Sequence, residues 1–434
     1  MAKILSCGKI NKQYKYMLFY VIIKIVNDYF FSDLFPKQIK PEVLEPNNYP
    51  PNILIQIFFN YIGGFIFSSF LYLYQNKQGK NKIKEESQIQ RDSLSKHTLI
   101  YDQKKPNYKN PSIYFTIALL IISLELIGIL SNVGFWSILY WTFDIFFVSY
   151  INNLMFGIEI YSHKKLAIII MVIFCTIFKF VSTYVIISND EYNLFYKNHI
   201  ILIPIIIILY IFLSLIRFYS LCKMKYLLDY KFIPETIFFF LYNSVAIIIL
   251  LVPCLIFSFV QCKDKAQLND VDLICTIKIE AGDKIEYYFD SFSYFFEQLW
   301  RKDKNVGLNI LYLFLFIIRL LLNALQLLYT ILIIRHLNPE YYYCAYNLYC
   351  NLVRIASFIN AIVNDGNIYS EIYNACSEFG SLIGMLIYLE FIDLKFCRLN
   401  FNLRKNIQNR SEIDYNIDEL LSEKEENENE NENN

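Results

Sequence analysis

The sequence has few of the residues that bind metals or carry out catalysis. Only four histidines occur among 434 residues, and the ten cysteines include no CxxC pair. No histidine and cysteine stand at metal-ligand spacing. P-loop, GxSxG and HExxH motifs are also missing. We therefore expect a protein that is not an enzyme and that carries no cofactor and no metal.

An excess of charge of either sign is missing as well. The 40 Lys and Arg residues balance the 40 Asp and Glu residues, so the formal net charge is zero. Binding to nucleic acid depends on neutralising phosphates with a basic excess. Nucleic acid is therefore not an expected partner.

Apolar residues are what the chain has in abundance. Hydrophobic residues make up 56% of it, above the roughly 45 to 50% of soluble domains. They gather in runs of about 20 residues, the length that crosses a bilayer as a helix. The composition predicts an integral membrane protein whose main partner is the lipid bilayer.

The apolar runs predict an all-α, polytopic bundle of about ten transmembrane helices. The first run contains Lys24 and Asp28, which are four residues apart and can pair on a helix. A signal peptide is the rival interpretation of this run, so nine spans are the alternative. The predicted spans are 16–34, 53–74, 113–130, 135–156, 166–187, 199–218, 236–260, 306–334, 340–363 and 371–393.

The distribution of Lys and Arg predicts that both termini are cytoplasmic, with the bundle at 15–393. The N-terminus (1–14), a flexible loop (75–112) and an acidic, disordered tail (394–434) then lie in the cytoplasm. The loop at 261–305 is luminal or extracellular. It contains Cys262 and Cys275, and the sequence leaves open whether they form a disulfide. It also leaves open whether the membrane is an endomembrane of the ER or Golgi or the plasma membrane.

Six ionisable side chains fall well inside the predicted spans. Each costs about 2.5 to 3.5 kcal/mol if it faces lipid at mid-depth, so each is expected to face the bundle interior and find a partner. Structural pairing among them and a role in coupling transport to an ion are both open. These residues are Glu125, Asp144, Lys179, Arg319, Arg354 and Glu378.

Two spans add polar stripes at helical spacing. Arg319, Asn323, Gln326 and Thr330 recur at i, i+4, i+7 and i+11 on one helix face, and the next span repeats this pattern. Guanidinium groups offer fixed bidentate donors to anions. The pattern predicts a site for a small polar or anionic solute. Its expected residues are Arg319, Asn323, Gln326, Asn351 and Arg354.

The last span carries a face of small residues, which lets two helix backbones approach closely. Packing within one chain and contact between two chains of a homodimer both fit this face. Its members are Ser377, Gly380, Ser381 and Gly384.

Ten spans divide into two sets of five. Because five is an odd number, the second set crosses the membrane in the opposite orientation to the first, as in inverted-repeat carriers. Three segments also carry a family resemblance: LCKMKYLLDYKFIPETIFFFLYN, TILIIRHLNPEYYYCAYNLY and IGMLIYLEFIDLKFCRLNFNLRKNI. They resemble protist multi-pass membrane proteins that are distantly similar to the nucleotide-sugar-transporter-like branch of the drug/metabolite transporter superfamily. The resemblance covers roughly 110–410. It implies two inverted five-helix halves, a central solute site and alternating access.

Two functions follow as expectations. The first is a secondary transporter of a small polar or anionic solute, such as a nucleotide sugar or another metabolite. The alternative is a non-transporting membrane scaffold or receptor whose intramembrane charges are structural.

Overall fold

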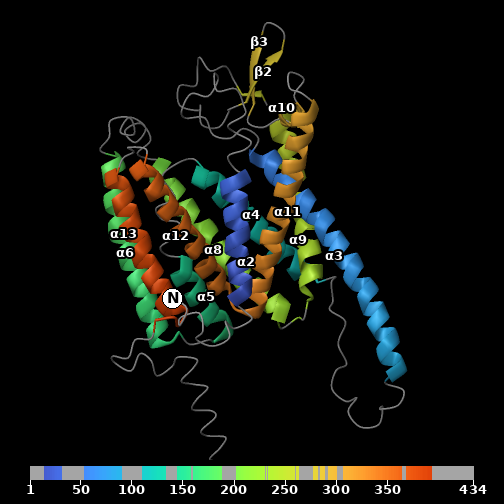
Figure 1. Cartoon of the computed structure of the whole chain (residues 1–434), viewed down its shortest axis with the longest axis horizontal. Coiled ribbons are helices and arrows are strands. Elements are labelled where there is room, and N and C mark those ends of the chain that lie inside the picture. The colour runs from blue at the N-terminus through green and yellow to red at the C-terminus, as the bar shows by residue number, and fades with distance from the viewer. Residues whose placement is uncertain are drawn as a thin grey trace, which may run out of the picture. The chain divides into compact units, whose positions relative to one another are not determined.

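The structure of the protein is a computed structural model, and its described part is mostly helical (Figure 1). The chain divides into two compact units. Unit 1 comprises Met1–Ser137 and His199–Tyr349, and unit 2 comprises Ile138–Asn198 and Cys350–Asn434. The described residues are 14–31, 53–89, 110–132, 144–157, 160–187, 202–229, 231, 233–259, 261–262, 277–281, 284–288, 292–300, 306–363 and 368–392.

Unit 1 is built from long helices that pack in pairs. Helix α3 packs against α9 and α11, α4 packs against α8 and α9, and α11 also packs against α2. The helices are α2 (Tyr14–Ile25), continued by the π-helical η1 (Val26–Phe31), then α3 (Ile53–Ile89), α4 (Pro111–Asn132), α8 (Leu202–Asp229), α9 (Glu235–Phe259), α11 (Val306–His336) and the first part of α12 (Pro339–Val363).

Each of the ten predicted apolar runs coincides with a helix, although some boundaries differ. Helix α3 continues to Ile89, about four turns beyond the predicted span and into the predicted flexible loop. Its extension is rich in Lys, Glu and Gln, which are strong helix formers. Among the described residues, four stretches are long and apolar enough to cross a membrane: Leu54–Gln75, Pro111–Gly128, Glu235–Phe259 and Asn309–His336.

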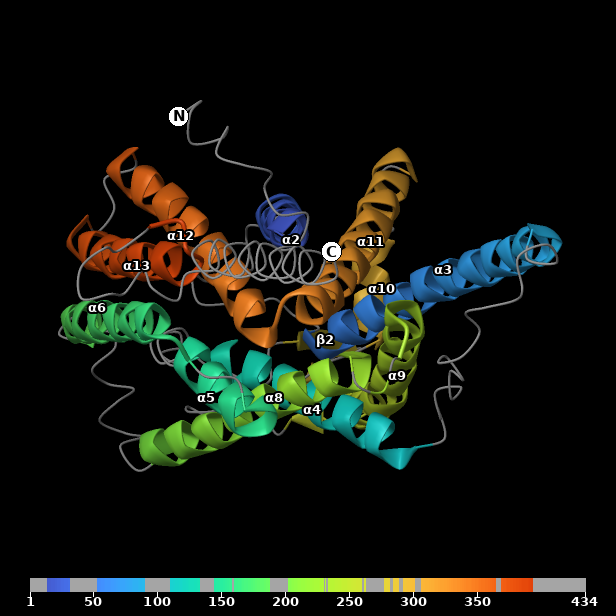
Figure 2. The same cartoon turned by 90° about the horizontal axis from the view of Figure 1, so that it is seen from below.

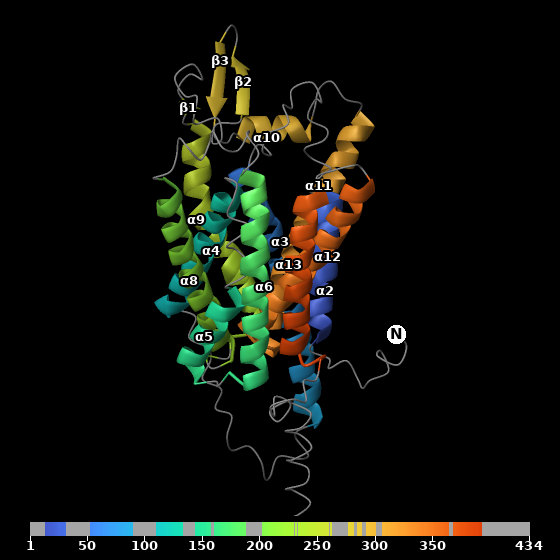
Figure 3. The ribbon, with the colours of Figure 1, turned by 90° about the vertical axis from the view of Figure 1, so that its left-hand side faces the viewer.

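The loop at 261–305 contains strands that an all-α prediction does not include. Strands β1 (Gln261–Cys262), β2 (Ile277–Ala281) and β3 (Lys284–Tyr288) form an antiparallel sheet in the order β1-β3-β2. Apolar and charged residues alternate along β2, which is the period of a strand. Figure 3 shows this sheet and the short helix α10 (Phe292–Leu299) beyond the end of α9. The other loop cysteine, Cys275, lies outside the described residues, so the question of a disulfide stays open.

Helix α10 anchors the loop to the bundle through aromatic side chains. The ring of Phe295 stacks on Phe59 of α3 at a centroid distance of 4.8 Å and contacts Phe316 of α11 edge-on at 5.7 Å. Phe295 and Phe316 belong to a buried core that also includes Phe58 and Leu250. The loop is therefore joined to the ends of α3, α9 and α11.

Two glycines let α3 approach its neighbours closely. A Cβ atom on Gly63 would lie 2.7 Å from the Cβ atom of Leu320 on α11. A Cβ atom on Gly64 would overlap the carboxamide of Asn243 on α9. The Asn243 side chain is buried and donates a hydrogen bond to the Phe239 carbonyl at 2.8 Å. The backbone of α3 can pack against both helices only because these side chains are absent.

Unit 2 contains α5 (Asp144–Phe156), α6 (Ser162–Ile187), α13 (Ile368–Tyr388) and the remainder of α12. Helices α6 and α13 lie side by side along their length (Figure 2). On α13, a Cβ atom at Gly380 would overlap Phe174, and one at Gly384 would lie 2.9 Å from the Ala167 carbonyl oxygen. Ser377 and Ser381 are buried. The small-residue face thus packs against α6 of the same chain, while the homodimer stays a prediction.

Replacing Gly64 with alanine is expected to destabilise the protein by about 1 to 3 kcal/mol, because the added methyl group forces the buried Asn243 side chain to move. The melting temperature of the purified protein in detergent measures the effect. Gly128→Ala is the matched control, since nothing lies within 4 Å of a Cβ atom added there. Equal melting temperatures for the two variants would contradict the close-packing explanation.

Candidate functional site

A charged network surrounds Asp28, where α2 passes into the π-helical turn η1. The Lys24 ammonium lies 2.9 Å from the Asp28 carboxylate, so the predicted pairing is confirmed. The Tyr349 hydroxyl of α12 donates to the same carboxylate oxygen at 2.7 Å. Arg319 of α11 interacts with Asp28 electrostatically. Such π-helical turns are frequent at functional sites because they break the regular backbone ladder.

Aromatic rings hold the Lys24 ammonium from a second side. Its nitrogen lies 4.8 Å from the ring centroid of Tyr349 and 5.4 Å from that of Tyr346. Both distances are in the range of cation–π attraction. A cation that is only 13% exposed is thereby compensated by one carboxylate and two rings.

A chain of amides joins this network to α3. Asn27 donates to the Asn323 side-chain carbonyl at 2.7 Å, and Asn323 donates to that of Asn60 at 2.8 Å. The predicted stripe on α11 therefore turns Arg319 and Asn323 toward α2, η1 and α3. In this conformation, these polar groups are bound to one another inside the bundle.

The other predicted solute-binding residues are divided between the units. Gln326 follows on α11 in unit 1, where its backbone carbonyl accepts a hydrogen bond from Thr330 at 3.0 Å. Asn351, which is buried, and Arg354 lie on the part of α12 that belongs to unit 2. A joint site of Arg319 and Arg354 stays a prediction.

Three more of the predicted charges lie in unit 2. Asp144 is buried and is the first described residue of α5, since 133–143 lie outside the described part. Glu378 is buried on α13. Lys179 belongs to α6, but its side chain is outside the described residues.

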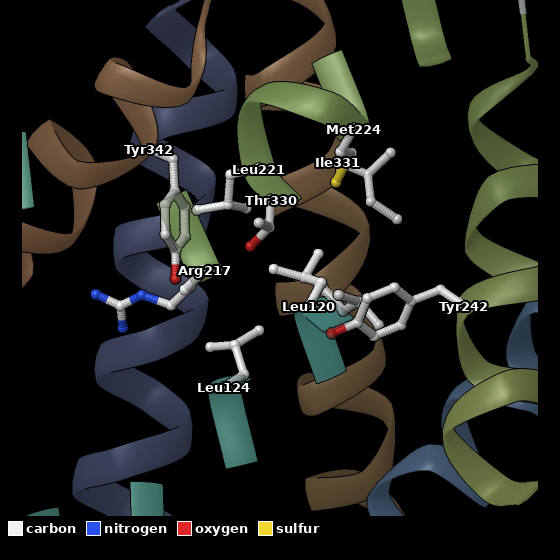
Figure 4. Close-up of a pocket in the computed structure, with 10 residues that line it drawn as sticks. Leu120, Leu124, Arg217, Leu221, Met224, Tyr242, Thr330, Ile331 and Tyr342 are labelled. Carbon is white, nitrogen blue, oxygen red and sulfur yellow. The ribbon is translucent and has the colours of Figure 1, made fainter. Parts of the chain in front are cut away.

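Unit 1 contains a cavity with a buried arginine in its wall. Arg217 of α8, only 4% exposed, lines the cavity together with Tyr242, Thr330 and Tyr342 from three other helices (Figure 4). Its guanidinium carbon lies 5.4 Å from the ring centroid of Tyr343. The cavity volume is about 30 Å³. This is room for a water molecule, whereas ligand sites usually exceed about 300 Å³, so the cavity must widen to bind a solute.

Sequence reasoning missed Arg217 because it ended the sixth span at Phe218. The helix continues to Asp229, which places Arg217 about three turns inside it. The segment after Phe218 contains no proline or glycine before Asp229. The lack of a helix-breaking residue in this segment was the sequence signal that α8 continues beyond Phe218.

Two tyrosines connect Glu125 of α4 to this cavity. The Tyr61 hydroxyl of α3 donates to the Glu125 carboxylate at 2.5 Å. The Tyr242 ring packs against the Tyr61 ring at a centroid distance of 6.0 Å and lines the cavity. The structure therefore pairs Glu125 with a hydroxyl of α3.

Ion pairs fasten the helix ends next to the cavity. Arg335, at the end of α11, lies 2.6 Å from Glu235 in the first turn of α9. Lys225 pairs with Asp229 at 2.7 Å and donates to the Arg335 backbone carbonyl at 2.5 Å. Acids at helix starts and bases at helix ends are favoured by the helix dipoles. This cluster closes one end of α8, α9 and α11, with Tyr242 about two turns further along α9.

Long apolar helices with polar groups buried between them define a helical membrane protein. No protein-family model matches the chain, and no curated protein matches it. The similarity to the drug/metabolite transporter superfamily accordingly stays a prediction.

Replacing Asp28 with asparagine is expected to lower stability by about 1 to 3 kcal/mol, because Lys24 and Arg319 lose their shared carboxylate. The loss is smaller than the roughly 3 to 5 kcal/mol of a fully buried pair, since the Asp28 side chain is 35% exposed. Thermal or chemical unfolding of the purified protein measures it.

Asp229→Asn is the matched control for this prediction. Its pair with Lys225 has the same i, i+4 spacing and nearly the same exposure, at 12% and 33%. We expect a loss of at most about 1 kcal/mol there. A loss as large as that of Asp28→Asn would show that Arg319 and Tyr349 add nothing to the Asp28 site.

Proposed function

We propose that the protein is a secondary transporter that moves a small polar or anionic solute by alternating access. The observation that carries this proposal is Arg217, buried in the wall of a cavity between apolar helices. A guanidinium inside a membrane is costly, and such residues mark solute and ion pathways. Its fixed donors suit a carboxylate or phosphate group.

We propose that the ten helices form two inverted halves, an architecture that suits this mechanism. We number the helices by the predicted spans: α2 with η1, α3, α4, α5 and α6 as the first half, and α8, α9, α11, α12 and α13 as the second. The first three helices of each half, with the start of α12, lie in unit 1. The last two helices of each half lie in unit 2, except for the first part of α12. Such a division is expected when two equivalent halves each contribute to both units.

The packing within each unit follows the same equivalence. Helix α4 packs against α8, and the equivalent pair in the other half is α11 against α2, which also pack together. The contact of α3 with α11 is matched by that of α9 with α4. Helices α3 and α9 are equivalent to each other and in contact, and so are α6 and α13. A repeat too diverged to appear in the sequence would leave this pattern.

A non-transporting scaffold or receptor is the second candidate, and the Asp28 network is the observation that favours it. Lys24, Arg319 and Tyr349 all interact with one carboxylate. Charges that compensate one another in this way can serve packing alone. Arg217 instead lines a cavity between apolar helices, which is why we prefer transport.

A thermal-shift screen with inorganic phosphate, nucleotides, nucleotide sugars and small organic acids tests the proposal. An anion that binds only the native state at about 100 times its Kd stabilises it by about 2.7 kcal/mol. We expect at least one anion to raise the melting temperature, and Arg217→Gln to abolish the shift. Lys223→Gln is the control. This substitution also removes one positive charge from α8, but the Lys223 ammonium lies over the Tyr226 ring and not in the cavity wall.

Arg319→Ala and Arg354→Ala extend the same screen to the predicted stripes. If the shift survives in Arg217→Gln and is lost in these two, the site lies at the stripes instead of the cavity. If no anion stabilises the wild-type protein and reconstituted vesicles take up none of them, the scaffold or receptor is the correct reading.

A further inference from the structure

Glu125 differs from Asp28, Asp229 and Glu235 of unit 1, which each form an ion pair, in the partners that surround it. From α3 it receives the Tyr61 hydrogen bond, and from α9 it interacts with Tyr242. Helix α8 packs against α4 as well, but its Arg217 lies in the cavity wall. Among the described residues, no lysine or arginine forms an ion pair with Glu125.

We infer that Glu125 is a proton-binding site and that the transported solute moves together with a proton. This inference rests on the proposed transport function and names its coupling ion. Two neutral hydroxyls cannot balance a full negative charge in apolar surroundings. A proton bound at the Glu125 carboxylate neutralises its negative charge. The charge of Asp28 is instead balanced by the cations Lys24 and Arg319.

The tyrosines provide a path from the cavity to the carboxylate. A hydronium ion in the widened cavity gives a proton to the Tyr242 oxygen, and Tyr242 passes its own proton to Tyr61. Tyr61 passes its proton along the existing hydrogen bond to Glu125. Each hydroxyl keeps one proton, the hydronium ion becomes water, and the carboxylate becomes a carboxylic acid.

The positions of the two charges explain why proton and anion would move together. An anion at Arg217 places a negative charge in the cavity wall that Tyr242 shares. A negative Glu125 two hydroxyls away repels it, and a protonated Glu125 does not. Proton binding therefore favours anion binding, and by reciprocity the anion favours the proton.

Infrared difference spectroscopy of the purified protein tests the proton site without any solute. Lowering the pH from about 9 to about 5 is expected to raise a carboxylic-acid C=O band that is absent in Glu125→Gln and shifted in Tyr61→Phe, whose hydroxyl bond is lost. Asp229→Asn, at the exposed helix end, is the control that keeps the band. A wild-type band that survives in Glu125→Gln, or no such band at all, overturns the inference.

Vesicle transport tests the coupling, with whichever anion of the screen stabilises the protein. For one proton per monoanion, a gradient of one pH unit supports at most about tenfold accumulation. We expect Glu125→Gln to accumulate no anion above equilibrium while still exchanging labelled for unlabelled anion. Gradient-driven accumulation by Glu125→Gln overturns the coupling role.

The two tests fail separately. If the band belongs to Glu125 but no anion of the screen is bound or transported, the proposed transport function is wrong and the proton site remains. If transport occurs but ignores the pH gradient, transport stands and the proton coupling is wrong.

Discussion

The Asp28 carboxylate is the interaction on which the polar interior of unit 1 depends. It balances Lys24 on its own helix and Arg319 on α11, and it accepts the Tyr349 hydroxyl of α12. Without it, two cations between apolar helices would lose the carboxylate that they share, which is costly in a bilayer. The neighbouring amides of Asn27, Asn323 and Asn60 extend the same network to α3. Three helices are thus fixed around the π-helical turn.

Sequence reasoning reached this network in part, for definite physical reasons. Lys24 and Asp28 are local, and Arg319 and Asn323 share a helix face, so spacing alone predicts both pairs of neighbours. That the two pairs meet depends on tertiary packing, which spacing does not contain. Tyr61, Tyr242 and Tyr349 went unnoticed because tyrosine is common here, with 36 residues, and an aromatic residue in an apolar run looks like core. Hydropathy located the helices but ended the helix α8 about three turns too early.

The glycines show how the charged and apolar parts of the bundle are connected. Gly63 and Gly64 bring α3 against α11 and α9, and Asn60 and Tyr61 precede them on the same helix. A hydrogen bond of 2.5 to 2.8 Å to Glu125 or Asn323 needs the backbones at a fixed distance. Close packing at the two glycines therefore sets the geometry of both polar networks. A side chain at either glycine would separate helices whose polar groups have no water to replace their partners.

Under the proposed pairing of the halves, Arg319 on α11 and Glu125 on α4 occupy equivalent helices, yet their surroundings differ in kind. Arg319 interacts with a carboxylate, so its positive charge is balanced as long as Asp28 stays ionised. Glu125 interacts with hydroxyls, which balance a neutral acid better than an anion. One half would then hold a permanent charge pair and the other a charge that comes and goes with a proton. Equivalent backbones with unequal charges would give the proposed transporter a rigid part and a responsive part within one fold.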